Sequence, residues 1–280
     1  MKLGFVLEGG AMRGLYTEGV LDTLKEYNII ADGIIGVSAG VLFGVNYKSN
    51  QPKRALRYCK KYAADKRFMG MNSLITTGDY INVKFGYDTI PNNLDKFDYK
   101  AFDNNKMKFY ATITNVDTGK PEYPLLTNSK KQMDVMRASG SMPFLSRMVQ
   151  LPTGKYLDGA IGDSIPVKKM QDMGYDKIIV VLTRPNGYKK KKAPSMLAKI
   201  FYTNKPNLVK AINTRYIKYN ETIDYIEKLD KEGKIIVIRP SLDLGVKRTE
   251  KNPDKLQAIY DLGIKDTKDK LKVIEKYIER

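Results

Sequence analysis

The chain has 280 residues, of which 42% are apolar, so it is long enough to bury a complete core. Its 49 Lys and Arg residues outnumber 31 Asp and Glu, and the net charge of +18 favours anionic partners. The chain contains no His and only one Cys, Cys59, which excludes an internal disulfide and argues against a zinc site. We therefore expect neither a metal nor a cofactor.

Strand and helix patterns alternate through the first part of the chain. Short apolar runs predict buried strands at 3–7 and 33–37, and the first run is too short for a secretory signal. Helical spacing predicts helices at 12–27 and directly after Ser38. This order is typical of a parallel α/β sheet with covering helices.

The rest of the chain is predicted as a mixture of helices and strands around an irregular stretch at 68–100. We expect helices at 55–66, 131–138, 194–202, 206–231 and 253–278, strands at 107–114, 177–183 and 234–239, a short partner strand near 122 and a hairpin at 148–157. No repeat is visible. We expect a single domain over 1–280, with a catalytic core at 1–184 and a helical C-terminal annex at 185–280 that returns one strand to the sheet.

The most informative motif is Gly36-Val37-Ser38-Ala39-Gly40, between a predicted strand and a predicted helix. A Gly-x-Ser-x-Gly turn exposes the serine hydroxyl at the N-terminus of the following helix, and the glycines avoid collisions in that turn. The helix dipole favours negative charge at this place. Ser38 is thus a candidate nucleophile, and the alternative is a glycine-rich turn without chemistry.

A second glycine cluster, Gly9-Gly10-Ala11, also follows a strand and opens a helix. It matches neither a dinucleotide-binding loop nor a P-loop. Its backbone N–H groups suit an oxyanion hole for an acyl ester. Arg13 either adds positive potential and fastens this loop or forms a buried ion pair.

The base for Ser38 cannot be histidine. Asp158 is the best candidate because it follows a predicted strand and precedes Gly159. A carboxylate of ordinary pKa is a weak base for a serine proton, and burial brings that pKa into a more useful range. A Ser–Lys dyad is the competing arrangement.

Together these motifs resemble the patatin-like phospholipase family, in particular its bacterial branch. The order of the glycine loop, the Ser38 elbow and Asp158-Gly159-Ala160 is the family's order, and 138–143 and 163–167 are also similar. The resemblance implies a three-layer α/β/α fold with a mainly parallel sheet, Ser38 as nucleophile and Asp158 as base. It also implies oxyanion N–H groups from Gly9, Gly10 and Ala11.

Two positions depart from the family pattern. The family usually has a third glycine where Ala11 stands, and its Asp motif often continues with two glycines, where this chain has Gly159 and Ala160. Alanine keeps its N–H group but disfavours a positive φ. We therefore expect Ala11 to affect the geometry of the oxyanion hole more than any other feature of the site.

The resemblance implies a hydrolase that cleaves acyl chains from phospholipids, lysophospholipids or related esters through an acyl-Ser38 intermediate. Alternatives are a small-ester or thioester hydrolase on the same dyad, and an idle lipid- or membrane-binding protein. A basic nucleic-acid-binding module is the least favoured alternative, because no nucleic-acid-binding motif accompanies the positive charge.

One segment suggests contact with an anionic membrane. Lys189, Lys190, Lys191 and Lys192 directly precede a predicted helix with Met196, Leu197, Ile200 and Phe201 on one face. Packing of this face on the core is nevertheless the expected arrangement, and the helix at 206–231 is likewise expected to pack rather than form a lid. We expect a cytoplasmic protein, with peripheral membrane contact as the alternative.

Overall fold

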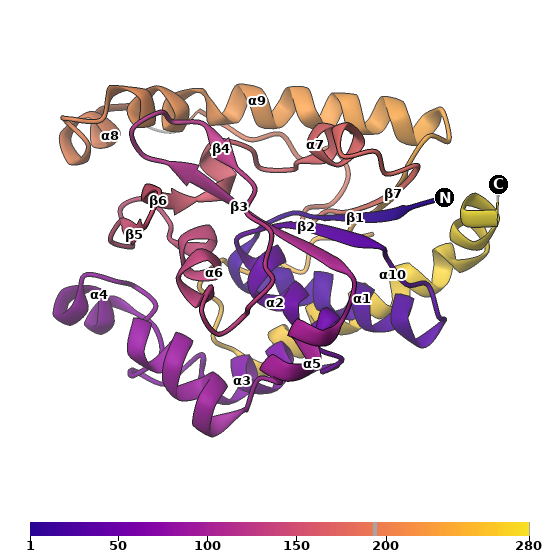
Figure 1. The fold of residues 1–280 in the computed structure, drawn as a ribbon, viewed down its shortest axis with the longest axis horizontal. Coiled ribbons are helices and arrows are strands. Elements are labelled where there is room, and N and C mark those ends of the chain that lie inside the picture. Colours follow the sequence, from indigo (N-terminus) through magenta and orange to yellow (C-terminus); the bar gives the residue numbers. More distant parts are fainter. Residues whose placement is uncertain (193–194, 280) are drawn as a thin grey trace.

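A computed structural model describes residues 1–192 and 195–279 (Figure 1). Its strands form an eight-stranded sheet in the order β5-β6-β3-β2-β1-β7-β8, with β4 pairing β3 outside this path. The strands are β1 (Leu3–Leu7), β2 (Gly33–Val37), β3 (Lys108–Asn115), β4 (Pro121–Glu122), β5 (Val149–Leu151), β6 (Gly154–Asp158), β7 (Lys177–Val181) and β8 (Ile236–Ile238). β1, β2, β3, β7 and β8 run parallel, and the pairings of β4, β5 and β6 are antiparallel.

Helices cover both faces of this sheet (Figure 1). One face is covered by α1 (Leu15–Glu26), α2 (Ala39–Lys48) and α10 (Pro253–Glu279), and the other by α7 (Val167–Asp172) and α9 (Pro206–Lys231). Successive side chains of β1 point to opposite faces of the sheet, and both faces are apolar. Phe5 and Leu7 enter the core under α1 and α10, while Val6 enters the core under α9. The expected three-layer α/β/α fold with a mainly parallel sheet is confirmed.

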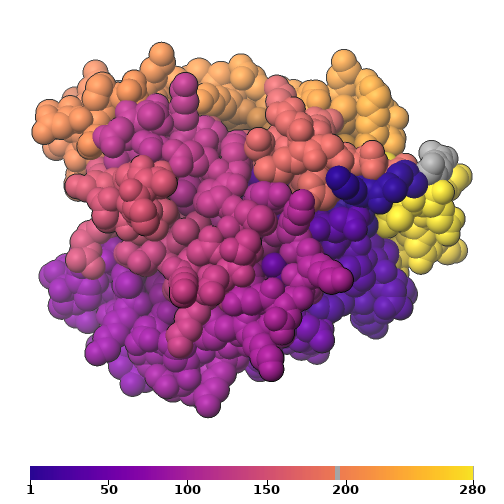
Figure 2. Space-filling model, in the orientation of Figure 1, coloured from indigo at the N-terminus to yellow at the C-terminus, as the bar shows by residue number. Residues whose placement is uncertain are grey.

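The remaining helices extend this frame. They are α3 (Arg54–Tyr62), α4 (Met71–Thr77), the π-helical η2 (Phe85–Leu94), α5 (Tyr99–Asn104), α6 (Met133–Gly140), α8 (Ser195–Phe201) and two 3₁₀ turns, η1 (Ala11–Gly14) and η3 (Gly159–Ile161). In the space-filling view, α8 and α9 form an orange band along one side and the segment around α3 and α4 forms the opposite side (Figure 2).

The C-terminal helix α10 is part of the central core. It crosses α1 at two glycines: a Cβ on Gly19 would lie 2.2 Å from the Tyr260 carbonyl oxygen, and one on Gly263 would lie 2.3 Å from that of Tyr16. Tyr260 is buried in the same contact. The backbones of α1 and α10 therefore approach more closely than any side chain would permit.

Most predicted elements are present, with shifted ends, but the irregular stretch predicted at 68–100 is wrong. This stretch contains α4, η2 and the start of α5. Gly70 and Gly78 bound the short α4, and Pro91 lies inside η2, so the sequence shows no clear helical period here. The short α7 was not predicted, and Pro194 of the predicted helix at 194–202 lies outside the described residues.

Candidate active site

Ser38 and the Gly9-Gly10 loop lie at the same edge of the sheet. β1 and β2 run parallel, with Leu7 opposite Gly36, so the loops that follow them leave the sheet side by side. A Cβ on Gly9 would lie only 2.9 Å from the Cβ of Ser38. Only glycine permits this close approach of the loop to the serine.

Ser38 occupies a strained turn. Its φ of 54° and ψ of −118° are rarely adopted by a residue with a side chain, as expected for a nucleophile elbow. The flanking glycines make this turn possible, because a Cβ on Gly40 would lie 2.5 Å from the Leu7 carbonyl oxygen and one on Gly36 would lie 2.8 Å from the Gly40 carbonyl carbon. Both glycines thus have the structural role that the motif predicts.

A second serine holds the turn in place. The Ser38 backbone N–H donates a hydrogen bond of 2.9 Å to Ser139 Oγ, whose hydroxyl donates to the Thr112 carbonyl oxygen at 2.7 Å. Ser139 is fully buried at the end of α6. It therefore connects the turn that carries Ser38 to β3, a role not predicted from the sequence.

Asp158 ends β6 and lies opposite Ile113 of β3, which pairs with β2 on its other side. Its Oδ1 accepts a 2.9 Å hydrogen bond from the Ala160 N–H. A Cβ on Gly159 would lie 2.1 Å from the Thr112 carbonyl oxygen, so glycine is required directly after the aspartate. Ser38 and Asp158 line one shared cavity.

Burial raises the pKa of the Asp158 carboxyl group. The Arg215 charge, the Ala160 N–H, the nearby Ser38 hydroxyl group and the Arg248 charge oppose this shift without cancelling it. The carboxylate is thus a stronger base than an exposed aspartate. This is the change that a serine nucleophile needs in the absence of histidine.

The glycine loop presents free donors beside Ser38. Among the described residues, none accepts a hydrogen bond from the backbone N–H of Gly9, Gly10 or Ala11. All three residues line the same cavity as Ser38. Ala11 has a φ of 50°, in the left-handed region that favours glycine, so the departure at this position carries backbone strain.

We expect the substitution Ala11→Gly to raise the free energy of unfolding by about 1 kcal/mol, because glycine adopts this φ without the steric cost. Urea unfolding of both proteins measures the difference. Ala31→Gly is the control, since Ala31 is a buried alanine without a positive φ and its substitution should destabilise. A loss of stability in Ala11→Gly would contradict the assignment of strain to this residue.

Arg13 does not form the buried ion pair considered above. It is 8% exposed, and no described carboxylate lies within 4.0 Å of it. Its Nε is buried without a hydrogen-bond partner among the described residues. Burial and the charges of Arg184 and Arg248 lower the pKa of Arg13 to about 10. The guanidinium is still charged at neutral pH, and Arg13 therefore contributes positive potential beside the loop.

An apolar cavity of about 110 Å³ begins at Ser38, and we call it the apolar cavity. Its walls come from α2, α3, η2 and α6, with a short stretch around Met69. Representative lining residues are Leu42, Phe68, Tyr87, Ile90, Met136 and Met142. This mainly apolar lining suits a hydrocarbon chain.

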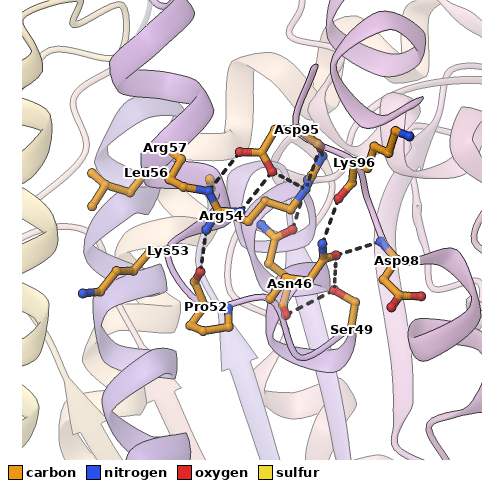
Figure 3. Close-up of polar contacts among 12 residues, drawn as sticks. Asn46, Ser49, Pro52, Lys53, Arg54, Leu56, Arg57, Asp95, Lys96 and Asp98 are labelled. Atoms are coloured by element: carbon orange, nitrogen blue, oxygen red, sulfur yellow. Dashed lines mark hydrogen bonds and ion pairs between the residues drawn. The ribbon is translucent and has the colours of Figure 1, made fainter. Parts of the chain in front are cut away.

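Polar contacts fasten the wall formed by η2 (Figure 3). Arg54 donates from Nε to the Asp95 carbonyl oxygen at 3.1 Å and from Nη1 to Asn46 Oδ1 at 3.2 Å. Arg57 makes two 3.0 Å hydrogen bonds to the Asp95 carboxylate. The end of η2 is thereby tied to α2 and α3.

We expect Arg54→Ala to lower the free energy of unfolding by about 3 kcal/mol, because it leaves buried polar groups without partners. The Arg54 side chain is 5% exposed, whereas that of Arg57 is 53% exposed. Arg57→Ala is therefore the matched control and should cost less than about 1 kcal/mol. Equal losses in denaturant unfolding would contradict this role for Arg54.

A second, larger cavity of about 490 Å³ also reaches Ser38, and we call it the cationic chamber. Its lining includes the acids Glu8 and Asp158. The basic residues that line it are Arg13, Arg184, Lys189, Lys190, Lys191, Arg215 and Arg248. Ser38 lies in the walls of both cavities.

Glu8 connects separate segments of the chamber wall through hydrogen bonds. Its Oε2 accepts hydrogen bonds from the Thr183 N–H at 2.7 Å and the Thr183 hydroxyl at 3.1 Å, and its Oε1 accepts one from the Tyr219 hydroxyl at 2.9 Å. The end of β1 is thus joined to α9. Glu8, Arg184, Arg215 and Arg248 were not predicted as site residues, because none lies in a distinctive local motif.

The structure alters the interpretation of the lysine run. Lys190 lines the cationic chamber, with its Nζ 4.0 Å from the centre of the Tyr219 ring. Lys189 pairs with Asp224, while Lys191 and Lys192 are exposed. The four lysines therefore do not form one uniform surface patch.

Comparisons with known proteins agree with this architecture. The model of the family "Patatin-like phospholipase" matches residues 5–170, and that of a "Domain of unknown function (DUF6363)" matches residues 205–279. The uncharacterized protein YjjU of Escherichia coli is 31% identical over 191 residues, which cover 66% of this chain and 53% of YjjU. Lysophospholipase nte1 of Aspergillus fumigatus is 28% identical over 180 residues, which cover 64% of this chain and 12% of that protein.

Among solved structures, VipD from Legionella pneumophila superposes with a TM-score of 0.47 at 13% identity. The superposition covers 97% of this chain and 67% of VipD.

Proposed function

Since this chain belongs to the patatin-like phospholipase family, we propose that it is a lipid acyl hydrolase that works with Ser38 and Asp158. The observation that carries the proposal is the place of Ser38, in the walls of the apolar cavity and the cationic chamber at once. An acyl ester with a polar head has the same two halves, joined at the reacting carbonyl group. The matched segments span 53% of YjjU and 12% of nte1, and the activity is proposed here from the site itself.

The proposed reaction has two displacements at one carbonyl carbon. Ser38 Oγ attacks the ester while its proton passes to the Asp158 carboxylate, and the N–H groups of Gly9, Gly10 and Ala11 stabilise the resulting oxyanion. The carbon–oxygen bond to the alcohol then breaks, and Asp158 returns the proton to the leaving alkoxide. Water repeats the sequence on acyl-Ser38, releasing the fatty acid and restoring both side chains.

Fatty-acid release tests this proposal. The wild-type protein is incubated with a monoacyl glycerophospholipid, a monoacylglycerol and a short-chain nitrophenyl ester. We expect release from long-chain substrates, with the chain in the apolar cavity. Turnover of the short ester alone would favour the small-ester hydrolase, and no turnover of any ester would overturn the proposal in favour of an idle lipid-binding protein.

We further propose that α8 contacts an anionic bilayer, which is the peripheral location considered above. Met196, Leu197, Ile200 and Phe201 are 49–70% exposed, contrary to the expectation that this face packs on the core. Lys191 and Lys192 lie close in sequence and are also exposed. In the described part of the chain, no helix is long and apolar enough to cross a bilayer, so the proposal is of surface contact only.

Sedimentation with vesicles checks this contact. Met196→Ser combined with Ile200→Ser should weaken binding to vesicles that contain phosphatidylglycerol. Ile75→Ser is the control, because Ile75 is 79% exposed on α4, away from α8. Equal binding of all three proteins, or equal binding to neutral vesicles, would contradict docking through α8.

A further inference from the structure

Six cations of the cationic chamber lack a carboxylate partner among the described residues. They are Arg13, Arg184, Lys190, Lys191, Arg215 and Arg248. Within the described ranges, no ion pair shorter than 4.0 Å involves any of them. Cations gathered in a concave site without neutralising partners attract an anion.

The two acids of the chamber do not neutralise these cations by direct pairing. Both Glu8 oxygens already accept hydrogen bonds, from Thr183 and Tyr219. Asp158 accepts its hydrogen bond from Ala160. The chamber therefore keeps an excess of positive charge around free space.

Tyrosine rings hold two of the cations in position. The Lys190 Nζ lies 4.0 Å from the Tyr219 ring centre, and the Arg184 guanidinium lies 4.4 Å from that of Tyr188. The two rings pack edge to face with centres 6.0 Å apart. Cation–π contacts fix the positions of these groups and leave their charge available.

The buried Nε of Arg13 is a second, independent indication of an anion site. This guanidinium nitrogen has no partner among the described residues, although Arg13 lines the chamber. A buried donor without an acceptor is costly, and a bound anion supplies the acceptor.

The charges around Lys190 also favour a bound anion. Burial and the charges of Arg215 and Arg248 lower its pKa to about 7, against the opposing effect of Glu8 and Asp158. A bound anion would favour the charged form of Lys190 and raise this pKa. Anion binding near pH 8 is therefore expected to take up a proton.

Most of these cations lie beyond the segment that carries the dyad. The patatin-like match ends at residue 170, whereas Arg184, Lys190, Arg215 and Arg248 follow it. Arg215 and Arg248 fall within residues 205–279, which match the domain of unknown function. Helix α9 brings Arg215 to the chamber, and the loop before α10 brings Arg248.

We propose that the C-terminal part of this chain builds a phosphate-binding subsite for the substrate headgroup, and that the enzyme prefers acyl esters whose headgroup is a net anion. The inference rests on the proposed acyl hydrolase function. The phosphate of a glycerophosphate ester lies a few bonds from the acyl carbonyl group, and the chamber begins at Ser38. A choline or ethanolamine group would bring a cation into an already cationic chamber, so zwitterionic headgroups are disfavoured.

Kinetic discrimination is the first test. Monomeric octanoyl esters of glycerol 3-phosphate, glycerophosphocholine and glycerol are compared by kcat/KM, which removes any effect of vesicle binding. The wild type should prefer the glycerol 3-phosphate ester over the glycerol ester, and Lys190→Gln and Arg215→Gln should each reduce that ratio about 10- to 100-fold. Lys192→Gln is the matched control, because it removes the same charge from an exposed residue outside the chamber lining and should leave the ratio within about twofold.

Arg215 also influences the Asp158 carboxyl group, so Arg215→Gln changes the reaction at the dyad for every ester. Dividing kcat/KM for the phosphate ester by kcat/KM for the neutral glycerol ester removes this shared effect. A wild type without preference for the phosphate ester, or equal ratios in Lys190→Gln and Lys192→Gln, would overturn the subsite.

Calorimetric binding to the Ser38→Ala protein gives a readout that needs no turnover. Glycerol 3-phosphate should bind with proton uptake at pH 8, and Lys190→Gln in the same background should weaken binding at least about tenfold and abolish the uptake. If the wild type hydrolyses no ester but this binding remains, the subsite stands and the proposed function fails. Inorganic phosphate binding as tightly as glycerol 3-phosphate, or no binding of either anion, would overturn the headgroup assignment.

Discussion

Replacing Ser38 by alanine is expected to lower kcat for acyl-ester hydrolysis by about 10⁴- to 10⁶-fold, the loss seen when a serine nucleophile is removed. The fold should be unaffected, because the substitution removes one hydroxyl group and relieves no packing contact. Fatty-acid release at saturating substrate measures the effect. A residual rate within tenfold of the wild type would mean that another group attacks the ester.

Ser139→Ala is the informative comparison for this variant. It removes the acceptor for the Ser38 N–H and the donor to the Thr112 carbonyl oxygen, but leaves the nucleophile in place. We expect a loss of about 10- to 100-fold, because the turn that holds Ser38 is loosened. An effect of Ser139→Ala as large as that of Ser38→Ala would place the nucleophile elsewhere.

Replacing Asp158 by asparagine is expected to lower kcat by about 10³- to 10⁴-fold, because the asparagine side chain cannot accept the serine proton. In the wild type, the rate should rise with pH as Asp158 loses its proton and then reach a plateau. Burial raises this pKa, so the rise lies at higher pH than for an exposed aspartate. The chain has no histidine, so a second step near neutral pH would report Lys190, whose pKa is lowered to about 7.

Asp158 also links pH to stability: a rise in pH that increases the rate decreases the contribution of Asp158 to stability. Because its pKa is higher in the folded protein than in the unfolded chain, its protonated form stabilises the fold at low pH, and this contribution is lost as the pH rises through the raised value. The difference in unfolding free energy between the wild type and Asp158→Asn should therefore change across that range. A pH-independent difference, or a pH–rate profile unchanged in Asp158→Asn, would contradict the role of this carboxyl group.

The residues of the proposed dyad could be predicted because each lies in a short motif with a local mechanical cause. Gly36 and Gly40 are required by the turn that exposes Ser38, and Gly159 by the contact of its backbone with β3. Such requirements are local in sequence and leave a visible pattern. Ala11 shows the same principle, since its positive φ was the difficulty expected where an alanine replaces a glycine.

The cations of the chamber could not be predicted, because their assembly depends on contacts between distant segments. Arg215 is one of many charged residues on α9, and only the packing of this helix beside β1 brings it to the chamber. Lys190 looks identical to its three lysine neighbours in the sequence. Its turn toward Tyr219 depends on hydrogen bonds between the Lys190 backbone and the Asn220 side chain, which no local pattern indicates.

The central claim is that Ser38 is the activated nucleophile of a Ser–Asp dyad. Reaction with a fluorophosphonate probe, followed by mass spectrometry of the labelled peptide, tests it most directly. We predict stoichiometric modification of Ser38 in the wild type, much slower modification in Asp158→Asn and none in Ser38→Ala. Labelling that persists in Ser38→Ala, or that is equally fast in Asp158→Asn, would contradict the dyad.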